Sequence, residues 1–143
     1  MTVSRIAGVL IALAVLLVAG CGSSSEKKSE PGNAEKECGP ALPAMAGSPT
    51  VPPKFPTPAS VTYTGESKAG PSTIVKGYRN GELADAFDSY KSAFDSAGYS
   101  VTHDEKEADD AEVNFEGGKS TGQVKMIQLC KDRTSLAITI RPQ

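Results

Sequence analysis

The amino-acid sequence predicts an α+β fold in which one amphipathic helix packs on one face of an antiparallel sheet of about five to six strands. One stretch, Leu83 to Ala97, carries its large apolar residues with the period of a helix. The segments on either side are rich in β-branched and aromatic residues, and those after the helix alternate apolar with polar residues. The expected order is two strands, one helix and a meander of three or four strands.

The two N-terminal strands are expected over Val61–Thr64 and Ser72–Tyr78, joined by a loop over Gly65–Pro71. Asn80 is the expected helix N-cap, and Gly98 stands where a C-cap glycine belongs. Five apolar residues fall within about an 80° arc of the helix, which is wide enough to cover one face of a sheet. They are Leu83, Phe87, Tyr90, Phe94 and Ala97.

The C-terminal strands are predicted from alternation with a period of two over Tyr99–His103, Ala111–Phe115 and Leu136–Ile140. Between the last two runs, Gln123–Cys130 breaks strict alternation, which favours a central strand or a bulge. Turns are expected at Gly117-Gly118 and Lys131-Asp132-Arg133.

The N-terminus has the pattern of an export signal. Arg5 is followed by the apolar run Ile6–Val18, which is too short for a spanning helix of about 20 residues. The run ends in Val18-Ala19-Gly20-Cys21, which resembles the lipobox of bacterial membrane lipoproteins. The resemblance implies cleavage between Gly20 and Cys21, so that residues 1–20 are removed as a signal peptide. An uncleaved anchor and an ordinary secretion signal are the alternatives.

The lipobox resemblance also implies where the protein resides. Cys21 would carry diacylglycerol and a further acyl chain such as palmitate, and two or three chains hold a protein stably on a membrane. The expected location is the extracytoplasmic face of the cell membrane. Because Gly22 follows the cysteine, the outer membrane is expected if the cell has two membranes.

Net charge argues against nucleic acid as a partner. Arg5 is the only charged residue within residues 1–20, so cleavage changes the formal net charge from −2 to −3. Nucleic-acid-binding proteins carry a basic footprint instead.

The cysteine count supports a disulfide once lipidation is taken into account. Acylation of Cys21 leaves Cys38 and Cys130, an even pair in an oxidising compartment. We expect these two to form a disulfide; two independent thiols are the alternative.

Composition divides the remaining chain into three parts. Residues 21–37 are polar and form a flexible tether behind the lipidated cysteine. Residues 38–58 are rich in proline and form a stiff spacer or a strap on the domain, while residues 59–143 form the globular domain. Pro53-Lys54-Phe55-Pro56 also matches the PxxP spacing of ligands for proline-binding grooves.

Gly117-Gly118-Lys119-Ser120 ends like a phosphate-binding loop, but its context does not support one. The pattern needs a glycine where this chain has Val113, and it needs a helix after Ser120, where a strand is expected. A hairpin turn is the better interpretation.

No catalytic or metal-binding constellation is expected. His103 is the only histidine and stands beside Asp104 and Glu105, with no Gly-x-Ser-x-Gly elbow in the chain. We expect it at the surface, with a pH-sensitive contact as the alternative. The acidic loop Asp104–Asp110 lacks the spacing of a calcium loop. With one histidine and two paired cysteines, a zinc site is not expected either, and no cofactor is implied.

The sequence therefore predicts a non-enzymatic, lipid-anchored envelope lipoprotein that presents its domain to an envelope protein or a surface ligand, through the open sheet face, an edge strand or the acidic loop. The Phe94–Tyr99 segment, in which an aromatic helix end passes through Ala-Gly-Tyr into a strand, resembles the small helix-on-sheet domains of envelope-assembly lipoproteins. A carrier of a small apolar ligand or lipid is the alternative function. An enzyme that works with Asp, Glu, Tyr or Ser alone is the third.

Overall fold

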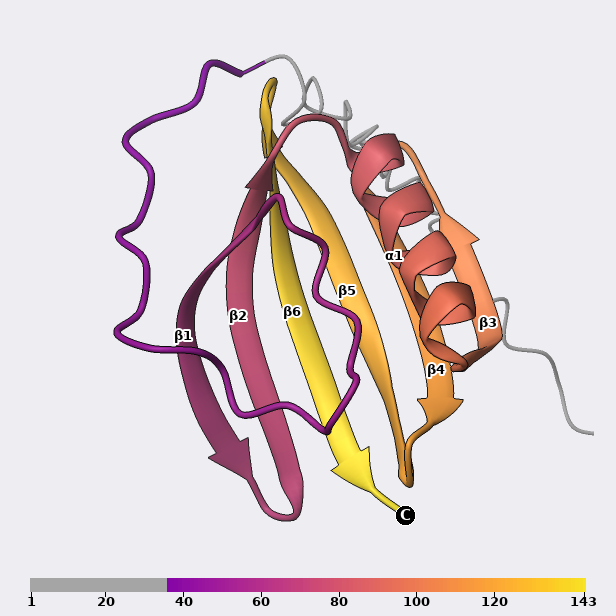
Figure 1. Cartoon of the computed structure of the whole chain (residues 1–143). Helices are drawn as coiled ribbons and strands as arrows, with labels where there is room; N and C mark the ends of the chain where they lie inside the picture. Colours follow the sequence, from indigo (N-terminus) through magenta and orange to yellow (C-terminus); the bar gives the residue numbers. More distant parts are fainter. Residues whose placement is uncertain (1–35) are drawn as a thin grey trace, which may run out of the picture.

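The computed structural model describes residues 36–143, in which a six-stranded antiparallel sheet carries one helix and a long N-terminal segment on the same face (Figure 1). The elements are β1 (Val61–Ala69), β2 (Ser72–Asn80), α1 (Leu83–Ala97), β3 (Ser100–Lys106), β4 (Asp110–Gly117), β5 (Ser120–Cys130) and β6 (Arg133–Pro142). We call residues 38–60, which precede β1, the strap.

The strand order across the sheet is β1-β2-β6-β5-β4-β3. Helix α1 carries the chain from β2 to β3 at the opposite edge, and the meander from β3 to β6 then returns until β6 pairs with β2. Each neighbouring pair is antiparallel. Helix α1 therefore has to cross the sheet between two strands that are not neighbours.

The α+β class expected from the sequence is wrong. Only 14% of the structure is helical, so the fold is a sheet-dominated one against which a single short helix packs. Because the apolar arc of the helix suits one face of a sheet, the sequence predicted that the helix would cover that face as a full layer. This prediction did not account for the width of the sheet, most of which lies beyond the helix.

Two local expectations are also wrong. The predicted loop over Gly65–Pro71 is mostly strand, because β1 continues to Ala69 after a shift of register between Tyr63 and Gly65. Asn80 is the last residue of β2, and the helix N-cap is Glu82, whose side chain makes no capping hydrogen bond. The glycine C-cap is confirmed, since Gly98 has a left-handed backbone with a φ of 76°.

The buried face of α1 is the face that the apolar spacing predicted. Phe87, Tyr90 and Phe94 are buried there, together with Leu83 and Ala86. Phe94 stacks on Phe115 of β4 with 4.6 Å between ring centroids. This aromatic pair forms the centre of the core.

A single helix cannot cover the whole face of this sheet. Six strands spaced by about 4.8 Å span roughly 29 Å, whereas a helix with its side chains is about 10 to 12 Å wide. Helix α1 packs mainly on β3, β4 and β5. The strap lies over the remaining part, where Figure 1 shows it crossing in front of β1, β2 and β6.

Phe55 attaches the strap to the core. Its side chain is 6% exposed and meets the rings of Phe94 and Phe115 edge-on, at 5.7 and 5.3 Å between centroids. At the outer edge of the sheet, the backbone N–H of Met45 donates to the carbonyl of Tyr63 at 2.8 Å. The strap is thus part of the folded unit, and Phe55 and Pro56 of the PxxP match are buried within it.

We predict that Phe55→Ala lowers the free energy of unfolding by about 3 to 5 kcal/mol, the usual cost of removing a buried Phe side chain. Leu42→Ala is the matched control in the same strap, because Leu42 is 66% exposed. It should change stability by less than about 0.5 kcal/mol. Equilibrium urea unfolding of the two variants measures the difference, and equal values would show that the strap does not contribute to the core.

Candidate functional site

The described residues form two hollows of about 350 Å³ each, one at the N-terminus of α1 and one under the strap. Both volumes lie near the lower end of the range for small-molecule sites, which is about 300 to 1,000 Å³. The two hollows differ in their lining residues, because four charged residues line the first hollow and one lines the second.

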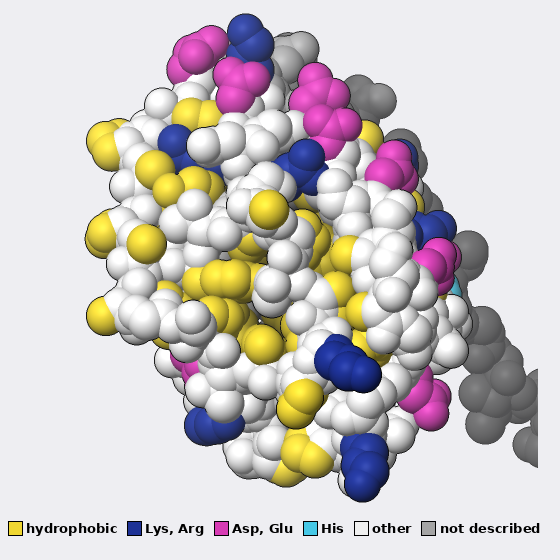
Figure 2. Space-filling model, viewed as in Figure 1, with side chains coloured by type: hydrophobic (Ala, Val, Ile, Leu, Met, Phe, Trp, Pro, Cys, Tyr) yellow, Lys and Arg dark blue, Asp and Glu magenta, His cyan; other side chains and the backbone are white. Residues whose placement is uncertain are grey.

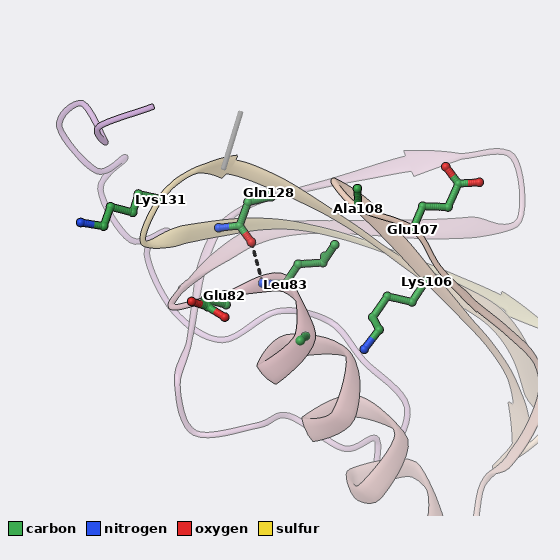
Figure 3. A pocket seen from close by; sticks show the side chains of 8 residues that line it. Glu82, Leu83, Lys106, Glu107, Ala108, Gln128 and Lys131 are labelled. Atoms are coloured by element: carbon green, nitrogen blue, oxygen red, sulfur yellow. Dashed lines mark hydrogen bonds between the residues drawn. The ribbon is translucent and has the colours of Figure 1, made fainter. Parts of the chain in front are cut away.

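In the hollow at the helix N-terminus, Gln128 reaches the first residue of α1 (Figure 3). Gln128 is 3% exposed, and its Oε1 accepts a hydrogen bond of 2.6 Å from the backbone N–H of Leu83. Its Nε2 donates to the carbonyl of Cys130 at 2.6 Å. Gln128 therefore replaces the missing side-chain cap of α1. The charged lining residues also balance in number: Glu82 and Glu107 against Lys106 and Lys131.

The hollow under the strap is mostly apolar. Figure 2 shows hydrophobic side chains gathered in a recess near the middle of the face that carries the strap and α1. Nine residues line the hollow: Gly47, Ser48, Pro49, Val51, Pro52, Lys54, Phe55, Thr57 and Tyr63. Lys54 is the only charged one among them. We call this region the strap hollow.

Tyr63, which lines the strap hollow, lies close to two residues of the core, Tyr90 and Arg79. The buried hydroxyls of Tyr63 and Tyr90 are near enough to each other for a hydrogen bond between them to shift both pKa values. Burial raises the pKa of Tyr63 above its ordinary value. Burial, followed by the neighbouring Tyr63, raises the pKa of Tyr90 much further, while the Arg79 guanidinium acts in the opposite direction. Both phenols are therefore neutral and able to donate.

The opposite face of the sheet carries no described helix. It exposes a mixed polar surface in which Ile127 and Leu129 of β5 are 37% and 45% exposed. Hydrogen bonds from Gln123, in the first place, and from Asn114 lower the pKa of Glu112 on this face. The Asn114 amide lies 2.6 Å from the Glu112 carboxylate.

Cys38 and Cys130 lie at disulfide distance, with their Cα atoms 5.2 Å apart. Two hydrogen bonds hold the same end of the strap: the N–H of Lys131 donates to the carbonyl of Lys36 at 2.8 Å, and Arg133 donates to that of Gly39 at 2.9 Å. The start of the strap is thus attached to the β5–β6 hairpin, while Phe55 attaches its far end.

His103 and Asp104 point to opposite sides of β3. His103 pairs with Asn114 on the open side and lies 3.9 Å from Glu105, with its side chain 62% exposed. Asp104 pairs with Val113 on the covered side and forms an ion pair of 2.6 Å with Lys91. The structure therefore places His103 at the surface, as expected, and does not bring the two side chains together.

Gly117-Gly118-Lys119-Ser120 forms the β4–β5 hairpin. Gly118 and Lys119 both have left-handed backbones, with φ of 57° and 61°, as a two-residue hairpin turn requires. Ser120 begins a strand rather than a helix. The hairpin interpretation is confirmed.

The other sites considered from the sequence are a metal site and the cleavage and lipidation residues. Within residues 36–143, no group of three or more His, Cys, Asp and Glu side chains is placed to hold a metal ion. Gly20 and Cys21, with the signal segment and most of the tether, lie outside the described residues.

The strap hollow was not predicted from the sequence. Its one signal was Phe55, the single aromatic residue of a proline-rich stretch that otherwise lacks a large aromatic side chain. Tyr63 was assigned to a strand, but the alternation did not show that its hydroxyl would be buried beside that of a helix residue 27 positions later in the chain.

Among the described helices none has the length and apolar character needed to cross a membrane. Comparison of the chain with protein-family models, with curated proteins and with solved structures finds no match.

We predict that Cys38→Ser lowers the free energy of unfolding by up to about 4 to 5 kcal/mol, because the disulfide would close a loop between residues 92 positions apart. Cys130→Ser and the double variant should show the same loss, since all three remove one bridge. Denaturant unfolding with and without a reductant measures this. A Cys38→Ser protein as stable as the oxidised parent would contradict the pairing.

Proposed function

We propose that the protein is a lipid-anchored, non-enzymatic binding protein of the cell envelope, and that its ligand is a small, mainly apolar molecule held in the strap hollow. The observation that carries the proposal is the hollow itself, which has a volume of about 350 Å³, mostly apolar walls and one charged lining residue, Lys54. Small-molecule sites typically combine apolar walls with a few placed polar groups.

The strap supports this proposal because it has no helix or strand, unlike the sheet that it covers. It joins the sheet through the Cys38–Cys130 pair at one end and Phe55 at the other. Between these points, its backbone makes three hydrogen bonds with the sheet: Gly39 accepts from Arg133, Met45 donates to Tyr63, and Thr50 donates to Glu66. The strap is therefore held at a few separate points rather than along its length.

The lipid anchor belongs to the same proposal and rests on the lipobox-like Val18-Ala19-Gly20-Cys21. Acylation of Cys21 would retain the domain at the membrane, behind a polar tether that ends near residue 37. A binding protein placed there would meet molecules that leave or enter the lipid surface.

A second candidate function is the docking of an envelope protein on the open face of the sheet. Ile127 and Leu129 favour it, because exposed apolar side chains on neighbouring positions of one strand are typical of contact surfaces. The two edge strands of the sheet are less suited to docking. Met45 of the strap bonds to β1. Charged or titratable residues line β3: His103, Asp104, Glu105 and Lys106.

Photolabelling of membranes that contain the full chain tests the strap hollow. A neutral long-chain alcohol with a photoreactive group should label peptides from residues 47–57. Ser48→Trp should reduce this labelling about tenfold, because the indole fills the hollow from its exposed rim. Leu42→Trp is the control and should leave the labelling unchanged. Equal labelling of both variants would refute the site.

Membrane fractionation tests the anchor separately. Cys21→Ala should prevent acylation and cleavage at the lipobox, and metabolic labelling with a clickable palmitate analogue should then give no signal. The parent chain should carry the label and remain in the membrane fraction. An unlabelled parent chain would contradict the lipoprotein assignment while leaving the strap hollow untested by this result.

A further inference from the structure

The open face of the sheet, opposite α1 and the strap, separates its charges by strand. Ile127 of β5 pairs with Ser135 of β6, which pairs with Tyr78 of β2. Because successive residues of a strand alternate between the two faces, this row identifies the other open-face residues of the three strands. They include four cations and four large apolar or aromatic residues: Lys76, Lys125, Arg133 and Arg141, with Ile74, Tyr78, Ile127 and Leu129. The sequences of β2, β5 and β6 contain no Asp or Glu.

The acidic residues of the open face lie on the two strands at its other side, β4 and β3: Asp110, Glu112, Glu116 and Glu105. Lys125 lies next to them, with its Nζ 3.8 Å from the Asp110 carboxylate. Lys76 and Arg141 form no ion pair with a carboxylate of the described residues. The strands β2 and β6 therefore keep free positive charge beside the exposed apolar residues of β5.

The chain enters the domain next to this surface. The N–H of Lys131 donates to the carbonyl of Lys36 at 2.8 Å, and Arg133 donates to the carbonyl of Gly39 at 2.9 Å. Arg133 thus belongs both to the attachment of the strap and to the open face, where its guanidinium lies 5.4 Å from the ring centroid of Tyr78.

The length of chain before this point limits how far the open face can lie from a membrane. Lys36 follows Cys21 by 15 positions, and a chain of that length spans at most about 50 Å. A lipid on Cys21 would therefore keep the domain close to a lipid surface, and the chain would enter it at the end of the open face that carries Leu129 and Arg133.

We propose that the open face of β2, β5 and β6 docks on an anionic lipid surface, with Lys76 and Arg141 near the lipid phosphates and Ile127 and Leu129 among the headgroups. The inference goes beyond the strap hollow, and its choice of partner rests on the lipid anchor of the proposed function. Basic residues attract anionic lipids, and apolar side chains strengthen binding by entering the interface. This orientation leaves the strap hollow uncovered, because the hollow lies on the opposite face.

Tryptophan fluorescence tests the docking, because the chain contains no tryptophan. In the acylated full chain, Ile127→Trp places one indole on the open face, and indoles favour the membrane interface. The vesicles consist of phosphatidylcholine, alone or mixed with phosphatidylglycerol, with brominated acyl chains that quench a nearby indole. We expect strong quenching in the mixed vesicles and little in the neutral ones. Leu129→Trp is a second reporter, because Leu129 is 45% exposed on the same face. Ser92→Trp is the control reporter, at an exposed position of α1, and should stay unquenched.

Charge variants on the Ile127→Trp background test the role of the cations. Lys76→Gln and Arg141→Gln should each lower the ratio of quenched to unquenched chains about fivefold, the effect of one cation near an anionic surface. Lys68→Gln is the matched control, because it removes the same charge from the covered side, where Lys68 bonds to Thr73 at 2.6 Å. It should leave the ratio unchanged.

Equal quenching in neutral and mixed vesicles, or equal quenching of the open-face and Ser92→Trp reporters, would overturn the inference. Vesicle flotation separates this result from the anchor. A chain that floats with the vesicles without quenching overturns the docking, keeps the anchor and leaves the open face to a protein partner. Quenching of Ile127→Trp in a chain without an acyl group on Cys21 supports the docking and contradicts the anchor. A chain that floats with neither kind of vesicle overturns both.

Discussion

The packing of Phe55 against Phe94 and Phe115 is the contact on which the covered face depends, because it joins the strap, the helix and the sheet at one point. A six-stranded sheet is more than twice as wide as one helix, so α1 alone leaves apolar residues of β1, β2 and β6 uncovered. The strap provides the missing cover without regular secondary structure. The edge-to-face contacts of Phe55 attach this cover to the core.

The irregular strap packs less closely on the sheet than a helix would. Two packed helices on a sheet fill their interface closely, whereas a proline-rich chain cannot follow the surface below it at each residue. The strap hollow lies where this fit fails, between the attachment of Phe55 and the edge of β1. The attachment of Cys38 to Cys130 limits how far the start of the strap can move away from the sheet.

The lining residues distinguish the two larger hollows more clearly than their size does. At the N-terminus of α1, Gln128 bonds to both the helix and the β5–β6 hairpin, and two Glu and two Lys residues line the hollow. The strap hollow is mostly apolar, and Lys54 is its one charged lining residue. Apolar walls with few polar groups are typical of small-molecule sites.

The sequence by itself determined the elements that depend on local periodicity. The apolar spacing from Leu83 to Phe94 predicted the buried face of α1, Gly98 predicted its end, and the alternation from Ala111 to Ile140 predicted the strands after it. These features follow from contacts between residues close in the chain, which a pattern can report. Only the tertiary structure decided how wide the sheet is, and therefore that the fold is sheet-dominated.

The candidate site was likewise decided by the tertiary structure. Phe55 of the strap and Tyr63 of β1 line the same hollow, and nothing in the spacing of either segment shows that they meet there. The pairing of Cys38 with Cys130 was inferred from a count, but the count could not show that it holds a strap over the sheet. A local pattern shows which face of a segment is buried. A site depends on which segments pack against each other, and the local pattern does not show that.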